Sequence, residues 1–588
     1  MKTRLTFTFF LALTALAAQT TILAGIVTER SGEPIIGANV FLQGTYDGTA
    51  TDLDGHFILS TTERDSQILL VSYLGYNTES VPLQLVGGEQ DLMILLRPAA
   101  TALDEVIITA GAFEASDEKK AVALRPLDIV TTAGATGDLV GALQTLPGAQ
   151  RVGEDGRLFV RGGAAHETRT FIDGVYVANP YASSVPNVPA RGRFSPFLFK
   201  GTTFSTGGYS AEYSQALSSA LILESQDLAP ESLTSLSLMS VGVGLARTQR
   251  WEETSLSVSA DYTNLSPYMG LVPQNIDWQE APNTLGGQVI FRHQFAPGSL
   301  LKVQAQHQQS GMALRTADPR EVTRQLNVSL NNAFSYGSFS WKTLLNDEWS
   351  LFIGGGWTRN QDGLATVIDQ QTVQTTATGK VRLSRELAPG MMLRLGGEYW
   401  YESYRDELQV EDYQEHNHLL QRYVAGFTEI DWRLTDRWVA RLGLRTEGSP
   451  ELATGASLSP RLSLAYKTGE HSQMGLAAGR FRQSPEQQWL RQSNDLRFET
   501  ADHFLLNWQW QRSGRTLRVE GYEKRYRDLV RTTAPTPDNS GDGYARGLDV
   551  FYRDKATIAN SDFWLSYSWI DTQREYLDYP QATRPPFA

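Results

Sequence analysis

The sequence predicts a mainly β protein whose largest part is an antiparallel transmembrane β-barrel, and three observations lead to this. The 588 residues include 51 glycines and 10% aromatic residues, a composition that favours β structure with many turns. From about residue 233, apolar and polar residues alternate in strand-length pieces. An export signal opens the chain, and no later stretch has the roughly 18 consecutive apolar residues of a spanning helix. If such a chain crosses a membrane, it must do so as a closed barrel.

Residues 1–18 are expected to be a secretory signal peptide. Lys2 and Arg4 precede an apolar core over Leu5–Leu16, and the sequence Ala15-Leu16-Ala17 supplies a small-x-small cleavage site. The alternative is an N-terminal core helix, which the placement of charges and small residues disfavours. The chain has no cysteine, which excludes lipoprotein processing, disulfides and a cysteine nucleophile.

Residues 24–97 are predicted to form a small β-sandwich, because short β-branched runs alternate with turn residues. In the sequence TDLDGHFIL, Asp54-Gly55 predicts a hairpin turn between two strands. Asp52 and Asp54 also begin like a calcium loop, but the later ligands of such a loop are missing, so a plain turn is expected.

The same region resembles the carboxypeptidase-regulatory-like domain, through the pattern GxVxxxxGxPIxGANVxLxGT followed by TDxDGxF. The resemblance implies a transthyretin/Ig-like β-sandwich. It does not imply a peptidase, because the region has no paired His and Glu at the spacing of zinc ligands.

Residues 112–228 are predicted to form an α+β domain. Leu139, Val140, Leu143 and Leu146 have helical spacing, and the following Pro147-Gly148 ends the helix. The sequences GRLFVRGG and TRTFIDGVYV then follow as strands joined by turn residues.

The order of motifs in this domain is more specific than any one of them. Leu-Pro-Gly, Val-Arg-Gly-Gly, Ile-Asp-Gly-Val and Gly-Gly-Tyr-Ser-Ala-Glu-Tyr follow one another. This order resembles the plug domain of TonB-dependent outer-membrane receptors of the Bacteroidetes type. The resemblance implies a plug inside a wide barrel.

Residues 233–588 are assigned to that barrel. In one strand Leu301, Val303 and Ala305 alternate with Lys302, Gln304 and Gln306, and in others Arg394, Glu398, Arg441, Arg445 and Arg461 share the polar face. A charged, glycine-containing face opposite an apolar face that ends in Trp or Tyr is typical of a barrel with a wet lumen and a lipid-facing outside. We expect about sixteen strands between residues 233 and 572.

Barrels of the receptors that the chain resembles have 22 strands, a width that needs a plug. The sequence ends in YPQATRPPFA, a Pro-rich turn in place of a closing strand with a terminal aromatic residue. We therefore expect that the last part of the barrel is missing and that the chain is a fragment or a truncated product. An open sheet edge in lipid would leave backbone groups unsatisfied.

Residues 102–111, ALDEVIITAG, place a short strand-forming segment where a linker would stand. It resembles the TonB box, which implies TonB as the partner, driven by ExbB–ExbD. A box of this kind attaches by adding a strand to the sheet edge of its partner. The alternative is an ordinary strand of the plug or of the sandwich. The residues assigned to TonB binding are Leu103, Asp104, Glu105, Val106, Ile107, Ile108, Thr109 and Ala110.

The resemblance implies active import through the outer membrane of a Gram-negative bacterium, with the sandwich and the box on the periplasmic side and outer-membrane lipid around the barrel. Alternatives are a binding or adhesion barrel without transport, or an inactive truncated remnant. The net charge of −13 argues against nucleic acid as a partner. No nucleophile–base constellation stands out, so neither an enzyme nor a cofactor is expected.

Residues 178–194, ANPYASSVPNVPARGRF, are assigned to the apical loop of the plug. Asn179, Tyr181, Arg191 and Arg193 are the candidate substrate contacts. Arginine suits an anionic small-molecule substrate such as a ferric-siderophore. The alternative is that both arginines pair with carboxylates of the barrel wall.

The sequence EDYQEHNHLL offers His416 and His418 beside carboxylates, a combination that could bind a transition metal. A solvated extracellular loop before a strand at residues 419–432 is the favoured interpretation, so no metal site is expected.

Overall fold

The chain divides between Val106 and Ile107 into two units, which we describe separately. The computed structural model describes residues 20–28, 34–35, 38–43, 45, 47–52, 54–73, 79–96, 122–124, 132, 135, 138–153, 155–185, 188–318, 321, 323–346, 348–512, 515–554, 556–558, 561 and 563–588. The expected signal peptide and the expected TonB box both lie outside the described residues.

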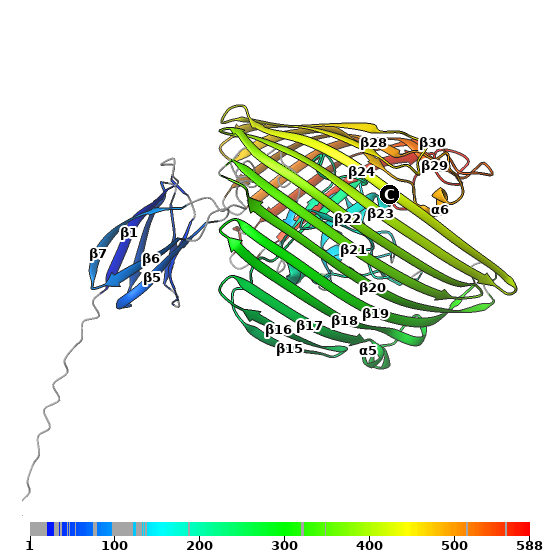
Figure 1. Ribbon diagram of the computed structural model, residues 1–588, viewed down its shortest axis with the longest axis horizontal. Helices are drawn as coiled ribbons and strands as arrows, with labels where there is room; N and C mark the ends of the chain where they lie inside the picture. Colours follow the sequence, from blue (N-terminus) through cyan, green and yellow to red (C-terminus); the bar gives the residue numbers. More distant parts are fainter. Residues whose placement is uncertain are drawn as a thin grey trace, which may run out of the picture. The chain divides into compact units, whose positions relative to one another are not determined.

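The first unit contains two facing sheets (Figure 1). One has the order β4-β1-β7, with β1 at Thr21–Thr28, β4 at His56–Thr61 and β7 at Gly88–Leu95. The other has the order β3-β2-β5-β6, with β2 at Asn39–Leu42, β3 at Gly48–Ala50, β5 at Asp65–Ser72 and β6 at Glu79–Leu85. Alternate residues of both sheets form one apolar core that includes Leu23, Val40, Phe57 and Leu69. This core holds the two sheets together as a sandwich.

The turn at Asp54-Gly55 is present, but the predicted hairpin is wrong. Asp52 Oδ1 accepts hydrogen bonds from the backbone N–H groups of Asp54 and His56, at 3.0 and 2.9 Å, and Gly55 has a φ of 76°. The strands on either side belong to different sheets, because β3 pairs with β2 whereas β4 pairs with β1. The turn therefore carries the chain from one sheet to the other.

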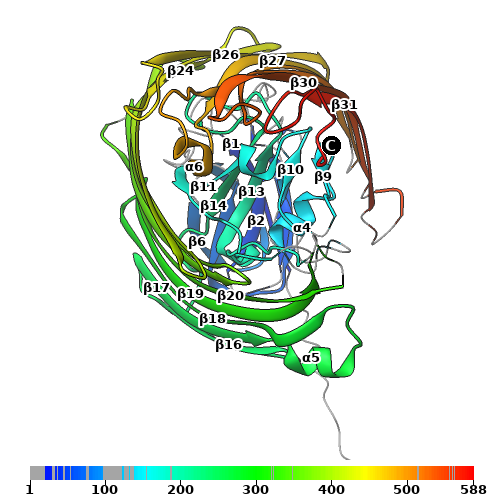
Figure 2. The same ribbon diagram turned by 90° about the vertical axis from the view of Figure 1, so that its right-hand side faces the viewer.

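The second unit contains a small domain, called the plug below, that lies within the curve of a much larger sheet (Figure 2). Its main sheet has the order β12-β11-β14-β13-β8. The bounds are β8 Val122–Leu124, β11 Thr168–Ile172, β12 Val175–Val177, β13 Phe199–Ser205 and β14 Ser219–Ser225. The short strands β9 Ala149–Gln150 and β10 Phe159–Val160 pair with each other, and η2 Ala165–Glu167 and η3 Pro196–Leu198 are single turns.

The predicted helix in the plug is present as α4, Leu139–Leu143. Asp138 caps its first turn by accepting a hydrogen bond from the Gly141 N–H at 3.1 Å, a common way to satisfy a free helix donor. Gly148, with a φ of 81°, turns the chain after the helix, as the sequence predicts. Leu139, Val140 and Leu143 are buried in the core of the plug.

Among the described residues, the large sheet has seventeen antiparallel strands paired in sequence order, so the mainly β fold class is confirmed and the count agrees with the expected number of about sixteen. The strands are β15 Leu233–Met239, β16 Gly242–Arg250, β17 Thr254–Asn264, β18 Asp277–Ala296, β19 Ser299–Ala317, β20 Gln325–Leu344, β21 Trp349–Ala365, β22 Asp369–Ala388, β23 Met391–Val410, β24 Tyr413–Arg433, β25 Trp438–Gly448, β26 Ser457–Gly469, β27 Ser472–Gln483, β28 Glu499–Arg512, β29 Arg515–Arg531, β30 Asp538–Asp554 and β31 Phe563–Arg574. Among the described strands, β15 and β31 stand at the two ends of the order.

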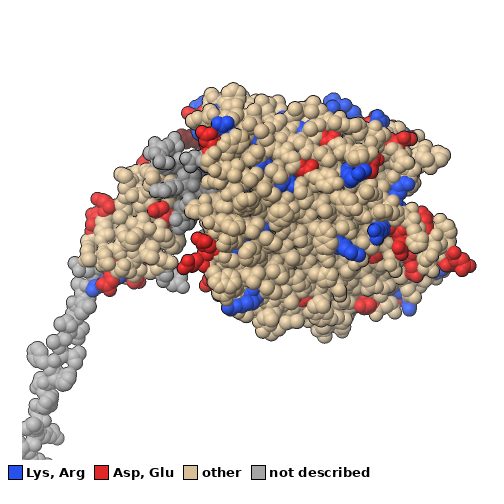
Figure 3. All heavy atoms as spheres, in the orientation of Figure 1, with Lys and Arg blue, Asp and Glu red and all other residues tan. Residues whose placement is uncertain are grey.

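The two faces of this sheet invert the usual burial of a soluble protein. On β25, Arg441 and Arg445 point to the inside and are 7% and 0% exposed, whereas Leu442 and Leu444 point outward and are 51% and 39% exposed. Charged side chains are sparse over much of the outer face in Figure 3. An apolar outside around a polar lumen is the pattern of a barrel wall that faces lipid.

The strand connections differ between the two ends of the sheet. One end, the short-turn end, has tight connections such as residues 297–298, 389–390 and 470–471. The other, the long-loop end, carries longer ones, including residues 265–276 with α5 Ser266–Leu271 and residues 484–498 with α6 Gln487–Leu490. None of the helices in the described part of the chain has the length and apolar character needed to cross a bilayer.

Candidate functional site: the plug, its anchors and the apical loop

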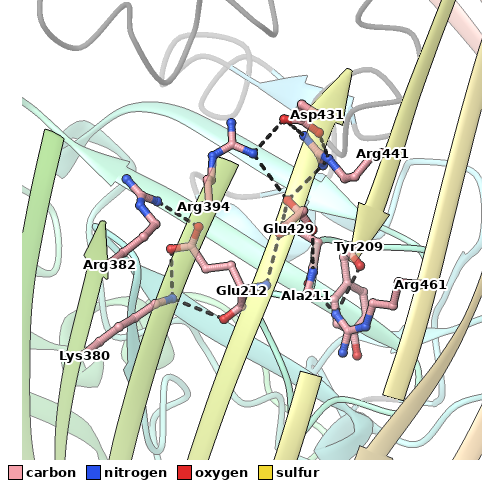
Figure 4. A network of polar contacts seen from close by, with 11 residues as sticks. Tyr209, Ala211, Glu212, Lys380, Arg382, Arg394, Glu429, Asp431, Arg441 and Arg461 are labelled. Atoms are coloured by element: carbon pink, nitrogen blue, oxygen red, sulfur yellow. Dashed lines mark hydrogen bonds and ion pairs between the residues drawn. The ribbon is translucent and has the colours of Figure 1, made fainter. Parts of the chain in front are cut away.

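One segment of the plug, Tyr209–Gln215, is held to the wall by charged side chains and is called the anchor segment here (Figure 4). Glu429 on β24 accepts hydrogen bonds from the Ser210 hydroxyl at 2.9 Å and from the Ala211 N–H at 2.8 Å. Arg394 and Arg441 lie 3.3 and 3.4 Å from the same carboxylate, and both also pair with Asp431 at 2.6 and 2.5 Å. Arg394 and Arg441 thus balance the charge of the Glu429 carboxylate, which binds the plug.

Arg445 on β25 is fully buried beneath the anchor segment. It donates to the Ala211 carbonyl at 3.1 Å, pairs with Glu447 at 3.0 Å and also contacts Glu398. Its neighbour Arg461 on β26 donates to the carbonyls of Tyr209 and Tyr213, at 3.1 and 2.8 Å. These guanidinium groups tie the backbone of the anchor segment to the wall.

Glu212 is the only carboxylate of the anchor segment, and it pairs with Lys380 at 2.9 Å and with Arg382 at 2.8 Å, both on β22. Burial by itself would raise the pKa of Glu212, but the positive charges of Arg382 and Lys380 outweigh this effect and lower the pKa to about 2. The anchor segment therefore carries a carboxylate that stays ionised far into acid.

This pKa predicts how the stability of the plug depends on pH. Because the folded-state pKa is depressed from 4.5 to about 2, Glu212 stabilises the fold above pH 4.5, and this contribution disappears as the pH falls towards 2. We expect the urea midpoint of the full chain in vesicles to fall as the pH is lowered from 4.5 towards 2. In Glu212→Gln the fall should be smaller, and equal falls in both proteins would contradict the assignment.

Other parts of the plug have charged anchors of their own. Arg161 pairs with Glu520 and Asp549, both at 2.6 Å, in a buried cluster on β29 and β30. Glu167 pairs with Arg574 on β31 at 2.5 Å, and Asp173 lies 3.4 Å from Lys302 on β19. Ion pairs thus fix the plug to β19 on one side of the lumen and to β29, β30 and β31 on the other.

Arg193, predicted to contact substrate, is buried at 5% exposure and already bound. It donates to the carbonyls of Asn179 and Tyr181 at 3.1 and 2.8 Å, and to Oδ1 of Asn332 and Asn360 on the wall, both at 3.0 Å. Burial lowers the pKa of Arg193 to about 10. Its hydrogen-bond partners on the wall are amides, and the charge of the wall carboxylate Asp362 on β21 also acts on it.

The other three candidates lie around Arg193 in the same loop. Asn179 has a φ of 54° and donates from Nδ2 to Gln374 Oε1 on β22 at 2.8 Å. Tyr181 is half-buried and forms an isolated bridge with Gly192, and Arg191 is exposed. Of the two predicted arginines, Arg191 is therefore the one presented to solvent.

The loop lies towards the long-loop end of the lumen. Val185 packs against Leu314 near the end of β19 and Leu330 near the start of β20, in a small apolar cluster. This cluster places the loop opposite the short turns. The described part of residues 178–194 therefore faces the end of the barrel where the longer loops gather.

His416 and His418 lie in a strand, so the expected loop is wrong. β24 begins at Tyr413, and the β23–β24 hairpin turns at Glu411-Asp412. His416 is 3.7 Å from Glu407, whereas Nε2 of His418 is 3.1 Å from the Ser403 hydroxyl. Across the part of the chain that the structure describes, no group of three His, Cys, Asp or Glu residues is placed to hold a metal ion.

The sequence comparisons agree with this architecture. The CarboxypepD_reg-like domain family matches residues 23–108. TonB-dependent receptor SusC of Bacteroides thetaiotaomicron is 31% identical over 191 residues, which cover 30% of this chain and 18% of that protein. TonB-dependent receptor P39 of Formosa agariphila is 24% identical over 451 residues, which cover 68% of this chain and 38% of that protein. The chain therefore matches less than half of the length of these relatives.

Solved structures are similar in fold at low sequence identity. The FrpB iron transporter from Neisseria meningitidis has a TM-score of 0.61 at 12% identity, over 78% of this chain and 81% of that chain. The ferric yersiniabactin uptake receptor FyuA from Yersinia pestis has a TM-score of 0.60 at 12% identity, over 79% and 80%. At this identity the likeness establishes the fold alone.

Proposed function

From the premise that this chain belongs to the TonB-dependent receptors of the Bacteroidetes type, we propose that it imports a scarce substrate actively through the outer membrane. The observation that carries the proposal is a separate domain held inside a lipid-facing sheet by ion pairs and hydrogen bonds, with no covalent link between them beyond the chain itself. Such contacts can break and re-form, as the removal of a plug requires.

The orientation follows from the connections of the strands. Outer-membrane barrels have short periplasmic turns and longer extracellular loops. The long-loop end is accordingly assigned to the outside, which places the apical loop where it meets substrate first. The sandwich and the TonB box are then periplasmic.

We assign the parts of the chain accordingly: a signal peptide at residues 1–18, the regulatory-like sandwich at 24–97, the TonB box and linker at 102–111, the plug at 112–228 and the barrel from 233. TonB is the proposed partner, with ExbB–ExbD as its energy source. A strand-forming segment that adds to the sheet edge of TonB transmits force along its own backbone.

The first described plug strand after the box is the weakest described point on the path of that force. β8 has three residues, lies at the edge of the plug sheet and pairs only with β13, through Val122–Leu124 and Thr202–Phe204, among the described strands. Later segments of the plug are held by ion pairs such as Arg161 with Glu520. A pull from the box therefore detaches β8 before the anchored part of the plug.

The proposed cargo is a small chelate such as a ferric-siderophore. Arg191 is the exposed cation of the apical loop, and a guanidinium group suits an anionic ligand. Two of the solved structures with a similar fold are an iron transporter and a ferric yersiniabactin uptake receptor.

Separate substitutions of Arg191 and Arg193 distinguish loss of substrate binding from loss of loop stability. We expect Arg191→Ala to weaken binding of an anionic ferric-siderophore to whole cells roughly tenfold or more, because one charged hydrogen bond is lost. Arg191→Lys, which keeps the charge, should retain most of the affinity. Arg193→Ala should instead lower the stability of the loop. If every siderophore tested binds Arg191→Ala as well as wild type, the anionic chelate is the wrong cargo.

The function itself is tested by uptake in energised cells. Accumulation of a bound ferric-siderophore should require the proton-motive force and should stop when a protonophore is added. Binding at the surface without energy-dependent accumulation would favour the alternative of an adhesion barrel or an inactive remnant.

A further inference from the structure

The sandwich has exposed apolar side chains on the outer side of the sheet β4-β1-β7. Four of them are between 37% and 84% exposed: Ile22 of β1, Ile58 of β4, and Met93 and Leu95 of β7. They alternate along their strands with residues of the buried core, so they point away from that core. These four residues and the half-buried Ile26 of β1 are called the apolar face here.

The register of the strands places these side chains next to one another. Ile26 lies opposite Met93 on β7, and Ala24 lies opposite Ile58 on β4. Ile22, Ala24 and Ile26 follow one another at every second position of β1 and so connect the two pairs. Single exposed apolar residues are common on soluble proteins, whereas a contiguous apolar patch marks an interaction site. The apolar face, which extends across all three strands, therefore has the character of a docking surface.

The sandwich that carries the apolar face is acidic. Residues 24–97 contain ten Asp and Glu residues against three arginines and no lysine, a net charge of −7 out of −13 for the whole chain. Two of these carboxylates, Glu89 and Asp91 of β7, lie opposite Ile22 and Ala24. Neither has a basic partner among the described residues. A partner that fits here is apolar where it meets the face and basic around that contact.

The chain between the sandwich and the proposed TonB box is short. Leu96 is the last described residue of the sandwich, and the proposed box begins at Leu103. Seven residues reach at most about 25 Å when they are fully extended. The strand directly before this linker is β7, which lies at the edge of its sheet and contributes Met93 and Leu95 to the apolar face. A protein that binds the box is therefore held close to the apolar face.

We propose that the apolar face is a second docking surface for the protein that engages the box, and that this protein presents an apolar surface bordered by basic residues. The inference rests on the proposed function, in which that protein is the periplasmic domain of TonB. Once the box is bound, the face meets its partner at a high effective concentration, so even a weak contact adds to the affinity. A second copy of this chain fits the face less well, because two acidic sandwiches repel each other.

Charge substitutions on the two sheets of the sandwich test the face. The measurement is the affinity of a purified periplasmic domain of TonB for the full chain in vesicles. Met93→Asp should bind the domain at least tenfold more weakly than wild type, because it places an unpaired charge in an apolar contact. The control Ile68→Asp lies on β5 of the other sheet, where Ile68 is 40% exposed, and should bind within twofold of wild type. Equal affinities of the two variants would overturn the inference.

The chemistry assigned to the partner has its own test. The double variant Glu89→Lys/Asp91→Lys reverses two charges beside the apolar face and leaves the apolar side chains in place. At low salt it should bind the TonB domain at least fivefold more weakly than wild type. The difference should shrink at 1 M salt, where charges are screened beyond about 3 Å. Binding of the double variant that equals or exceeds that of wild type at low salt would show that the partner is not basic and would overturn this assignment.

Single cysteines identify what covers the apolar face. The chain has no cysteine, so Met93→Cys and the control Ile68→Cys each introduce one thiol that can carry a photoreactive cross-linker. With the TonB domain present, Met93→Cys should give a product with the mass of the chain plus that domain, and Ile68→Cys should give at least tenfold less of it. A product of two chains, or a cross-link from Met93→Cys to the barrel of the same chain, would identify another occupant and overturn the inference.

The same measurements separate this inference from the proposed function. If the TonB domain binds wild type, fails to bind Ile107→Pro and binds Met93→Asp as well as wild type, coupling through the box stands and the docking surface fails. If Met93→Cys cross-links to the TonB domain but uptake does not depend on energy, the docking surface stands and active import fails. If the TonB domain binds none of these chains, both fail.

Discussion

Replacing Arg445 with methionine is expected to destabilise the seated plug by about 3–5 kcal/mol, the range for removing one partner of a buried ion pair. Arg445 is 0% exposed and binds Glu447, Glu398 and the Ala211 carbonyl. Methionine has a similar length, so little volume is lost. Two carboxylates would remain buried without their shared cation, and the anchor segment would lose a backbone contact.

The measurement is a urea titration of the full chain in vesicles, followed by tryptophan fluorescence. Trp400 on β23 stacks on Tyr176 of the plug with ring centroids 4.2 Å apart, and a parallel titration in a Trp400→Phe background separates its signal from those of the other 12 of the 13 tryptophans. Arg525→Met is the matched control, since Arg525 is 59% exposed and pairs with exposed Glu523, a kind of pair worth less than about 1 kcal/mol. Equal midpoints for the two variants would contradict the role given to Arg445.

Replacing Ile107 with proline is expected to stop energy-dependent uptake and to leave substrate binding unchanged. Proline removes a backbone N–H and fixes φ, so the segment can no longer complete a strand on the edge of a TonB sheet. Uptake should fall to the level of a TonB-deficient cell. Surface binding should persist, because the apical loop is a separate part of the chain.

Ala102→Pro is the control for this variant, because it places the same residue just outside the proposed box at residues 103–110. Its uptake should stay close to that of wild type. Normal uptake by Ile107→Pro would show that the coupling segment lies elsewhere in the chain. Loss of uptake in both variants would show that proline acts on the linker as a whole and not on the box.

The barrel could be predicted because its signal is local and repeated. Alternation on β19 predicted that Lys302, Gln304 and Gln306 share one face, and all three are buried in the lumen. Each strand repeats the same relation between its two faces, so small errors in boundaries do not change the prediction. The expected number of about sixteen strands therefore agrees with the seventeen that the structure describes, although boundaries are the least certain part of such a prediction.

The prediction of a hairpin failed because it depends on contacts between distant residues. Asp54-Gly55 predicts a turn correctly, but which strands pair is decided by the whole sandwich. The partners of Arg193 were likewise out of reach, because the sequence does not show that Asn332 and Asn360, 139 and 167 residues away, bind it. The charged faces of β24 and β25 were visible in the sequence, whereas their partners Ser210 and Ala211 could be found only from the structure.

The most direct test of the central claim, that TonB acts on this chain, is the binding of a purified periplasmic domain of TonB to the full chain in vesicles. We expect the domain to bind the wild-type chain, and to bind Ala102→Pro equally well. Ile107→Pro should bind at least tenfold more weakly, because the added strand cannot form. Equal affinity of the TonB domain for wild type and Ile107→Pro, or no binding to either, would contradict the account.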